Sequence, residues 1–264
     1  MTINGIRAAA AFTLIVVACV VPRRSDAQSI AQRVSSTRSG KVGFSFAPKP
    51  GVCGHNNSIS RGGGSRYNWS DTPSADVEYD SECSHFPVRV VLEVRDGNVQ
   101  KIRTYVGGRW RSGSTLTDLG TFSTKAATDY LLNLAATSDS RSAAHDAIIP
   151  ATLADSVTIW PALVRIGRDT SVPSSVRKQA IFWLAQEASD HVGGTRGDRN
   201  DPESEVKKQA VFALSQHKSG ESVETLMEVA RRNRDPEVRR TALFWLGQTN
   251  DPRVVPFFED ILKR

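Results

Sequence analysis

The chain contains an internal repeat, which constrains its fold more than any other feature. Residues 175–186, 205–216 and 237–248 follow one pattern, in which a valine, two basic residues, an alanine, a phenylalanine and a leucine lead to a final glutamine. The copies start 30 and 32 residues apart. Periods of this size are typical of proteins built from stacked structural units. We therefore expect an array of stacked units in the C-terminal half.

Each copy predicts a helix. Val176, Ala180, Trp183 and Leu184 lie at positions i, i+4, i+7 and i+8, which form one stripe of an α-helix, and Phe182 lies near the back of that stripe. A helix that is apolar on nearly two sides should be sandwiched between neighbouring units. The remaining face carries a basic row, which we interpret as solvated surface rather than a ligand site: Lys178, Lys208 and Arg240.

Asp-Pro pairs mark helix starts at 201–202, 235–236 and 251–252, because aspartate caps a helix and proline fits its first position. Apolar stripes predict partner helices at 154–168, 221–233 and 251–263. Upstream we expect a helix at 143–153, bent or broken near Pro150, and one at 123–136 capped by Ser123. Residues 191–200 read as a loop, so the copy that begins near Ser174 lacks a clean second helix.

Two-helix units that open with Asp-Pro-Glu-Val-Arg-Arg, as residues 235–240 do, resemble HEAT repeats, especially the HEAT-like repeats first noted in phycobilisome lyases. The resemblance covers residues 142–264. It implies a right-handed superhelix of antiparallel helix pairs, whose second helices line a concave face that usually binds protein. The segment after Ala188 departs from this pattern, which leaves open whether the stack is continuous there.

The N-terminal region follows a different periodicity. Apolar residues alternate along 88–94, Asp96-Gly97 supplies a tight turn, and 99–106 returns, which predicts a β-hairpin with one buried face. Residues 41–46 are a candidate third strand. Residues 51–81 are rich in Gly, Ser, Asn and Asp, so we expect a long irregular connection there.

These patterns predict an α+β chain. A HEAT-like α-solenoid of about four helix pairs, one of them degenerate, should follow a small β-rich module that carries a disulfide. We place the β-rich module at 28–118 and the helical repeat domain at 119–264.

The first 27 residues resemble a secretory signal peptide. Arg7 precedes an apolar run over 8–21, which is too short to span a bilayer, and Ala27 offers a cleavage point. We therefore expect export to the periplasm or the extracellular space, with no transmembrane segment in the mature chain. An alternative is a lipoprotein anchored at Cys19, since residues 15–19 resemble a lipobox.

Cleavage after Ala27 would leave two cysteines, Cys53 and Cys83, for which an oxidising compartment favours a disulfide. Closing a loop of ~31 residues would stabilise the fold by about 3 to 4 kcal/mol. The alternative is a zinc site, because His55 and His85 each follow a cysteine by two positions. We favour the disulfide and expect no metal or cofactor.

Charge argues against a nucleic-acid partner. Residues 28–122 hold 12 basic and 8 acidic side chains, a balance of +4, whereas residues 123–264 hold 19 of each, a balance of zero. A nucleic-acid binder normally presents a clustered basic face, which a neutral repeat domain does not favour.

No nucleophile elbow, zinc-protease motif or phosphate loop is present, so we expect a binding or scaffold module rather than an enzyme. Its partner should be a polar protein, bound by the outward side chains of second helices. The residues that we expect to line this surface are Glu224, Thr225, Glu228, Arg232 and, from an earlier unit, Arg165 beside Ala162. The alternative is an enzyme or enzyme accessory with a ligand pocket at the junction of the β-rich module and the first helices.

Overall fold

The computed structural model of the chain describes residues 26–61, 66–68, 74–192, 202–216 and 220–264. Most of the expected signal peptide, including Cys19, lies outside these ranges, as do residues 193–200 of the expected loop. The first described element is α1 (Asp26–Ser35). Among the described residues, no helix is long and apolar enough to cross a membrane.

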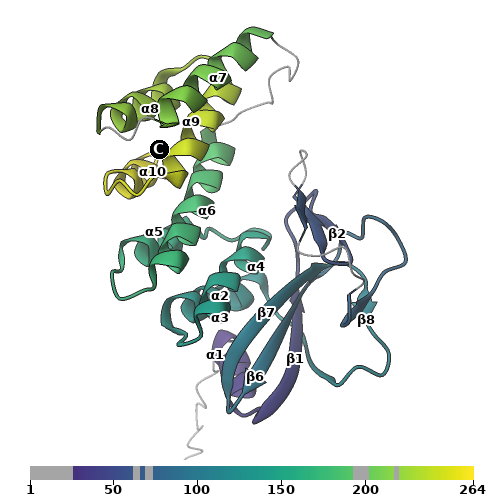
Figure 1. Cartoon of the computed structure of the whole chain (residues 1–264). Coiled ribbons are helices and arrows are strands. Elements are labelled where there is room, and N and C mark those ends of the chain that lie inside the picture. The colour runs from purple at the N-terminus through teal and green to yellow at the C-terminus, as the bar shows by residue number, and fades with distance from the viewer. Residues whose placement is uncertain (1–25, 62–65, 69–73, 193–201, 217–219) are drawn as a thin grey trace, which may run out of the picture.

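A four-stranded sheet forms the N-terminal part, with the strand order β7-β6-β1-β9 (Figure 1). Its strands are β1 (Ser39–Phe46), β6 (Val88–Arg95), β7 (Asn98–Val106) and β9 (Leu116–Thr121). The predicted hairpin is confirmed: β6 and β7 pair antiparallel around Asp96 and Gly97, whose φ angles of 51° and 75° suit a tight turn. The predicted third strand is also confirmed, because β1 pairs with β6. The sheet extends to Thr121, beyond residue 118, where we ended the β-rich module.

The two faces of the sheet have different neighbours. Alternate residues such as Phe44, Val90 and Leu92 are fully buried on the inner face, beneath α1, α2 (Thr124–Thr137) and α3 (Arg141–Asp146). Val91 and Tyr105 belong to the outer face, where they form a small second core with the segment containing β5 (Val77–Glu78) and with β8 (Arg109–Trp110). This alternation is the period of two that the sequence predicted.

The prediction of an irregular connection over 51–81 was wrong in part. β2 (Cys53–His55), β3 (Ser58–Ser60) and β4 (Arg66–Asn68) form a second, antiparallel three-stranded sheet. The strands are too short for a visible alternation of apolar residues. The disulfide between Cys53 and Cys83 is present, with the two Cα atoms 5.2 Å apart. Next to it, Gly54 and Ser84 exchange two backbone hydrogen bonds, which fix this sheet to the following loop.

In the described chain, four helices lie between the sheet and the first copy of the repeat. Ser123 caps α2 by accepting a hydrogen bond from the backbone N–H of Ala126, as predicted. The predicted helix at 143–153 is divided at Ala147 into α3 and α4 (Ile148–Thr152), so Pro150 lies within α4 rather than at the break. The helix expected at 154–168 begins later, as α5 (Trp160–Arg168). Its missing start is explained by the backbone of Ala154 and Asp155, which pairs with residues 47–48 instead.

The three repeat copies all form helices: α6 (Ser174–Val192), α7 (Pro202–Gln216) and α9 (Pro236–Gln248). Two of the predicted partner helices follow as α8 (Gly220–Arg232) and α10 (Val254–Leu262). The predicted start of α10 at Asp251-Pro252 was wrong, because the helix begins at Val254 with Arg253 as its N-cap. α6 extends through Val192, so residues 191 and 192 belong to a helix rather than to the expected loop.

The helices stack in two layers whose order differs from their order in the chain (Figure 1). In the first-helix layer, α9 lies between α6 and α7: Phe244 contacts Phe182 of α6, and Trp245 contacts Phe212 of α7. In the second-helix layer, α10 lies between α5 and α8, because its Glu259 pairs with Arg168 and its Asp260 pairs with Arg231. The last unit of the chain is therefore inserted between the two units that precede it.

Candidate protein-binding surface

The sequence of α8 gives this helix one buried and one exposed face. Val223, Leu226 and Ala230 are buried against the stack, and the side chains between them point outward. Glu221 lies in the first turn, and Arg231 and Arg232 lie in the last turn, so these charges complement the helix dipole. The buried face was predicted from the apolar stripe, and it leaves a polar row facing outward.

The four residues predicted on α8 are all exposed and lie along this row. The Glu228 carboxylate pairs with Arg232 one turn later, at 3.3 Å, and the Thr225 hydroxyl donates to the backbone oxygen of Glu221. Glu224 pairs with Arg253, at 2.8 Å. The contact with Arg253 could not be read from the sequence, because this residue belongs to the segment before α10.

Arg253 connects α8 to the start of α10. Its guanidinium also donates to the carboxylate of Asp251 and to the backbone oxygen of Gly220. The hydrogen bond from Arg253 lowers the pKa of Asp251, and the same bond raises the pKa of Arg253. Both groups therefore stay charged at neutral pH, and Arg253 joins the row on α8 to the segment before α10.

Arg165 lies apart from the α8 row, because α10 separates α5 from α8. It lines a groove of about 450 Å³ between α2 and α5. Ala162, predicted beside it, lines the same groove. The structure therefore places the predicted residues at two ends of the second-helix layer rather than in one cluster.

The α2–α5 groove has an apolar floor and a polar rim. Leu132, Ala136, Ala162 and Ile166 provide apolar lining, and the rim carries acid, amide and base side chains: Asp129, Asn133, Arg165 and Asp169. Hydrogen bonds from Ser171 lower the pKa of Asp169, which therefore remains an anion. An apolar floor with a rim of mixed charge is the usual composition of a protein-binding surface. The contribution of α2 was missed, since the sequence did not show which helix would lie beside α5.

A second pocket, of about 390 Å³, lies at the junction where we placed the alternative ligand site. It is bounded by α1, the turn between β6 and β7, and the end of α2. Its lining includes hydroxyl and amide side chains such as Ser35, Asn98 and Thr137. Tyr130 also lines it, and burial raises the pKa of this phenol, so it stays neutral.

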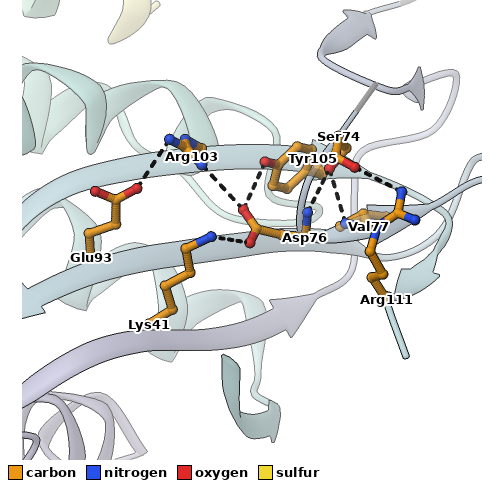
Figure 2. Close-up of polar contacts among 8 residues, drawn as sticks. All are labelled: Lys41, Ser74, Asp76, Val77, Glu93, Arg103, Tyr105 and Arg111. Atoms are coloured by element: carbon orange, nitrogen blue, oxygen red, sulfur yellow. Dashed lines mark hydrogen bonds and ion pairs between the residues drawn. The ribbon is translucent and has the colours of Figure 1, made fainter. Parts of the chain in front are cut away.

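The outer face of the large sheet carries a buried carboxylate, that of Asp76 (Figure 2). Its oxygens contact the ammonium of Lys41 at 2.5 Å, the guanidinium of Arg103 at 3.5 Å and the donating hydroxyl of Tyr105 at 3.2 Å. The Ser74 hydroxyl accepts hydrogen bonds from the backbone N–H groups of Asp76 and Val77. A buried charge requires such partners. These contacts fix residues 74–77 on the sheet and occupy both carboxylate oxygens.

The cysteines form one further cluster. Among the described residues, Cys53, Cys83 and His85 could present ligand atoms within 4.8 Å of one another. Both sulfurs are engaged in the disulfide, however, and so are not available as the thiolates that zinc requires. His55 is not part of this group; its Nδ1 lies 2.8 Å from the backbone oxygen of Ser81.

The paired helices α7 to α10, which are stacked on one another, correspond to a known repeat. Residues 199–264 match the family model of HEAT repeats. This range includes the second and third copies of the pattern and all of the α8 row. The resemblance seen in the sequence is therefore confirmed for the C-terminal part of the chain. Neither the curated proteins nor the solved structures contain a match to this chain.

The match covers two repeats, each made of two helices. α7 and α9 are the first helices of the two matched repeats, and α8 and α10 are the second helices. The α8 row thus lies on the second helix of its repeat. The sequence analysis expected second helices to bind protein. The α2–α5 groove continues the same side of the molecule beyond the matched residues.

Proposed function

We propose that this protein is a non-catalytic protein-interaction module of the cell envelope, which binds another protein with its second-helix layer. The α2–α5 groove carries this proposal, because it combines an apolar floor with a rim of both charges. The exposed α8 row extends the surface at the other end of the layer. The interacting residues proposed are Glu224, Thr225, Glu228 and Arg232 on α8 and Arg165 in the groove.

Export is proposed on two grounds. The sequence of the first 27 residues is typical of a signal peptide, and a disulfide between Cys53 and Cys83 suits an oxidising compartment. The charge balance of zero in residues 123–264 favours a protein partner over nucleic acid.

A ligand pocket at the junction of the sheet and the first helices is the alternative. The pocket bounded by α1, the β6–β7 turn and α2 has the size of a small-molecule site. This pocket supports an enzymatic role less well. Catalytic sites usually gather several groups with perturbed pKa values, and among the described residues that line this pocket Tyr130 is the one such group.

The experiment that tests the proposal combines photocrosslinking with charge reversal. A photoreactive amino acid at Thr225 or Ala162 should capture one envelope protein, identified by mass spectrometry. The double variant E224R/E228R should then reduce the yield of that same product about tenfold, as for lost charge pairs at an interface. Stability should change by less than ~1 kcal/mol, because both ion pairs are exposed.

The matched control is D80R/E82R. It also reverses two exposed acids in one segment, and it removes one exposed ion pair, between Asp80 and Arg109, where E224R/E228R removes two. Its crosslinking yield should equal that of the unmodified protein. Equal yields from E224R/E228R and the control would exclude the α8 row from the binding surface, and a missing crosslink from Ala162 as well would exclude the α2–α5 groove.

A further inference from the structure

The outward side of the first-helix layer carries one arrangement three times. On each of α6, α9 and α7, a basic residue, a phenylalanine and a glutamine follow one another at intervals of four residues, which places them along one side of the helix. We call this surface the Lys-Phe-Gln face. Its columns are Lys178, Phe182 and Gln186 on α6; Arg240, Phe244 and Gln248 on α9; and Lys208, Phe212 and Gln216 on α7.

The phenylalanines of this face are accessible although they are large and apolar. Phe212 is 42% exposed and Phe244 is 37% exposed, and Phe182 is half-buried. Phe182 and Phe244 contact each other across the α6–α9 seam, with ring centroids 6.4 Å apart. Trp245 lies between Phe244 and Phe212, at 5.0 and 5.1 Å from them. The rings therefore form a connected row that crosses all three helices.

Polar groups flank the aromatic row on both sides. Lys178 is exposed and has no ion-pair partner within the part of the chain that the structure describes. Arg240 pairs with Glu237 on its own helix and Lys208 is half-buried. Beyond the rings, Gln216 and Gln248 are exposed, and their amides can each donate and accept hydrogen bonds. Amides of this kind suit the N–H and C=O groups of a peptide backbone.

We propose that the Lys-Phe-Gln face binds an extended segment of another protein that carries acidic and apolar side chains. Helices in contact lie about 8–10 Å apart, and an extended peptide advances about 3.3 Å per residue, so a peptide lying across the three helices would pass one column roughly every three residues. Its apolar side chains would contact the phenylalanines, an acidic side chain would pair with Lys178, and its backbone would contact the glutamines.

This surface is distinct from the second-helix layer, so the proposal goes beyond the function proposed above. An anionic membrane is a less suitable partner, because membrane-binding surfaces depend on many basic residues and on apolar groups that project from the surface. Here the rings lie against Trp183 and Trp245.

The test uses the full chain and a labelled random copolymer of glutamate and tyrosine as the probe, with binding followed by fluorescence anisotropy. The copolymer should bind, whereas polyglutamate should bind at least about tenfold more weakly and a lysine–tyrosine copolymer should not bind. The variant F212A/F244A should weaken binding at least about tenfold, and the exposed change K178E about fivefold. R38E, the same charge change at an exposed residue of the sheet region, should leave binding unaltered.

K178E alters no core contact, so its effect does not depend on whether F212A/F244A folds as stably as the parent chain. Absence of copolymer binding at millimolar concentration, or equal binding by K178E and R38E, would overturn the proposal. Two other outcomes would also overturn it in favour of a different occupant: binding to phosphatidylglycerol vesicles that depends on Phe212 and Phe244, or a dimer in sedimentation that F212A/F244A dissociates. None of these readouts depends on the photocrosslinking at α8.

Discussion

Gly247 controls how closely α9 can approach α6. A Cβ at this residue would lie 2.6 Å from the Cβ of Ala185, a separation that real Cβ atoms do not adopt. The third copy of the repeat has glycine here, whereas the first has alanine and the second has serine. The seam between these helices therefore depends on the absence of one methyl group.

Replacing Gly247 with alanine should destabilise the protein by about 1–3 kcal/mol, because the added methyl group overpacks the seam. Urea unfolding followed by circular dichroism measures this loss. The double variant A185G/G247A has a single methyl group at the seam, as the parent chain does. It should therefore recover most of the stability that G247A loses, apart from the cost of placing a new glycine in a helix. If G247A unfolds at the same urea concentration as the parent chain, the close approach of α6 and α9 is not present in solution.

At the scale of elements, α9 is the central helix of the first-helix layer. Leu184, Leu214 and Leu246 occupy the same position of the three copies, but they do not have the same surroundings. Leu184 and Leu246 are fully buried, and Leu214 of α7 is only half-buried. The difference in burial between Leu246 and Leu214 thus reflects the position of their helices, α9 in the middle of the layer and α7 at its end.

The variants L246A and L214A test that order directly. L246A should cost about 2–5 kcal/mol, as for other fully buried leucines, and L214A should cost less than about half as much. Equilibrium urea unfolding of both variants gives the comparison, and both substitutions remove the same atoms from the same motif. A stack in chain order would place α7 in the middle, so equal losses, or a larger loss for L214A, would contradict the inserted position of α9.

At the scale of the whole molecule, the sheet and the helices share one hydrophobic core. Buried residues of the inner sheet face, such as Phe44, are continuous with those of α2 and α5 and, beyond them, with Phe258 of α10. Lys49 in the segment before β2 also pairs with Glu187 of α6, at 3.1 Å, and Arg61 stacks over the ring of Trp183. The β-rich part and the stack are therefore expected to unfold together.

Removing the disulfide should lower the stability of both parts. The variant C53S/C83S opens a loop whose ends are 30 residues apart in sequence, which should cost about 3 to 4 kcal/mol. Near-ultraviolet and far-ultraviolet circular dichroism should show one coincident thermal transition at a lower temperature. Two separate transitions, with only one shifted, would show instead that the helices fold independently of the sheet.

Local signals in the sequence were reliable where the structure depends on neighbouring residues. Ser123 caps α2, Asp96 and Gly97 form the hairpin turn, and the apolar stripe of α8 faces the core, all as predicted. Predicted helix boundaries were wrong where the backbone groups of a segment bond to residues distant in the sequence. Ala154 would suit a helix, but its backbone pairs with Pro48, more than a hundred residues earlier, and the helix starts later.

By itself, the sequence determined the repeat, the buried and exposed faces of its helices and the β-hairpin, and it favoured a disulfide between Cys53 and Cys83 over a zinc site. Only the tertiary structure decided that α9 lies between α6 and α7, that the phenylalanines form one connected row, and that Arg165 lies in a groove with α2. The physical reason is that the copies of the repeat have nearly the same apolar stripe, so each could pack on any other. The choice depends on the fit of particular pairs, such as Gly247 on Ala185 and Trp245 on Phe212.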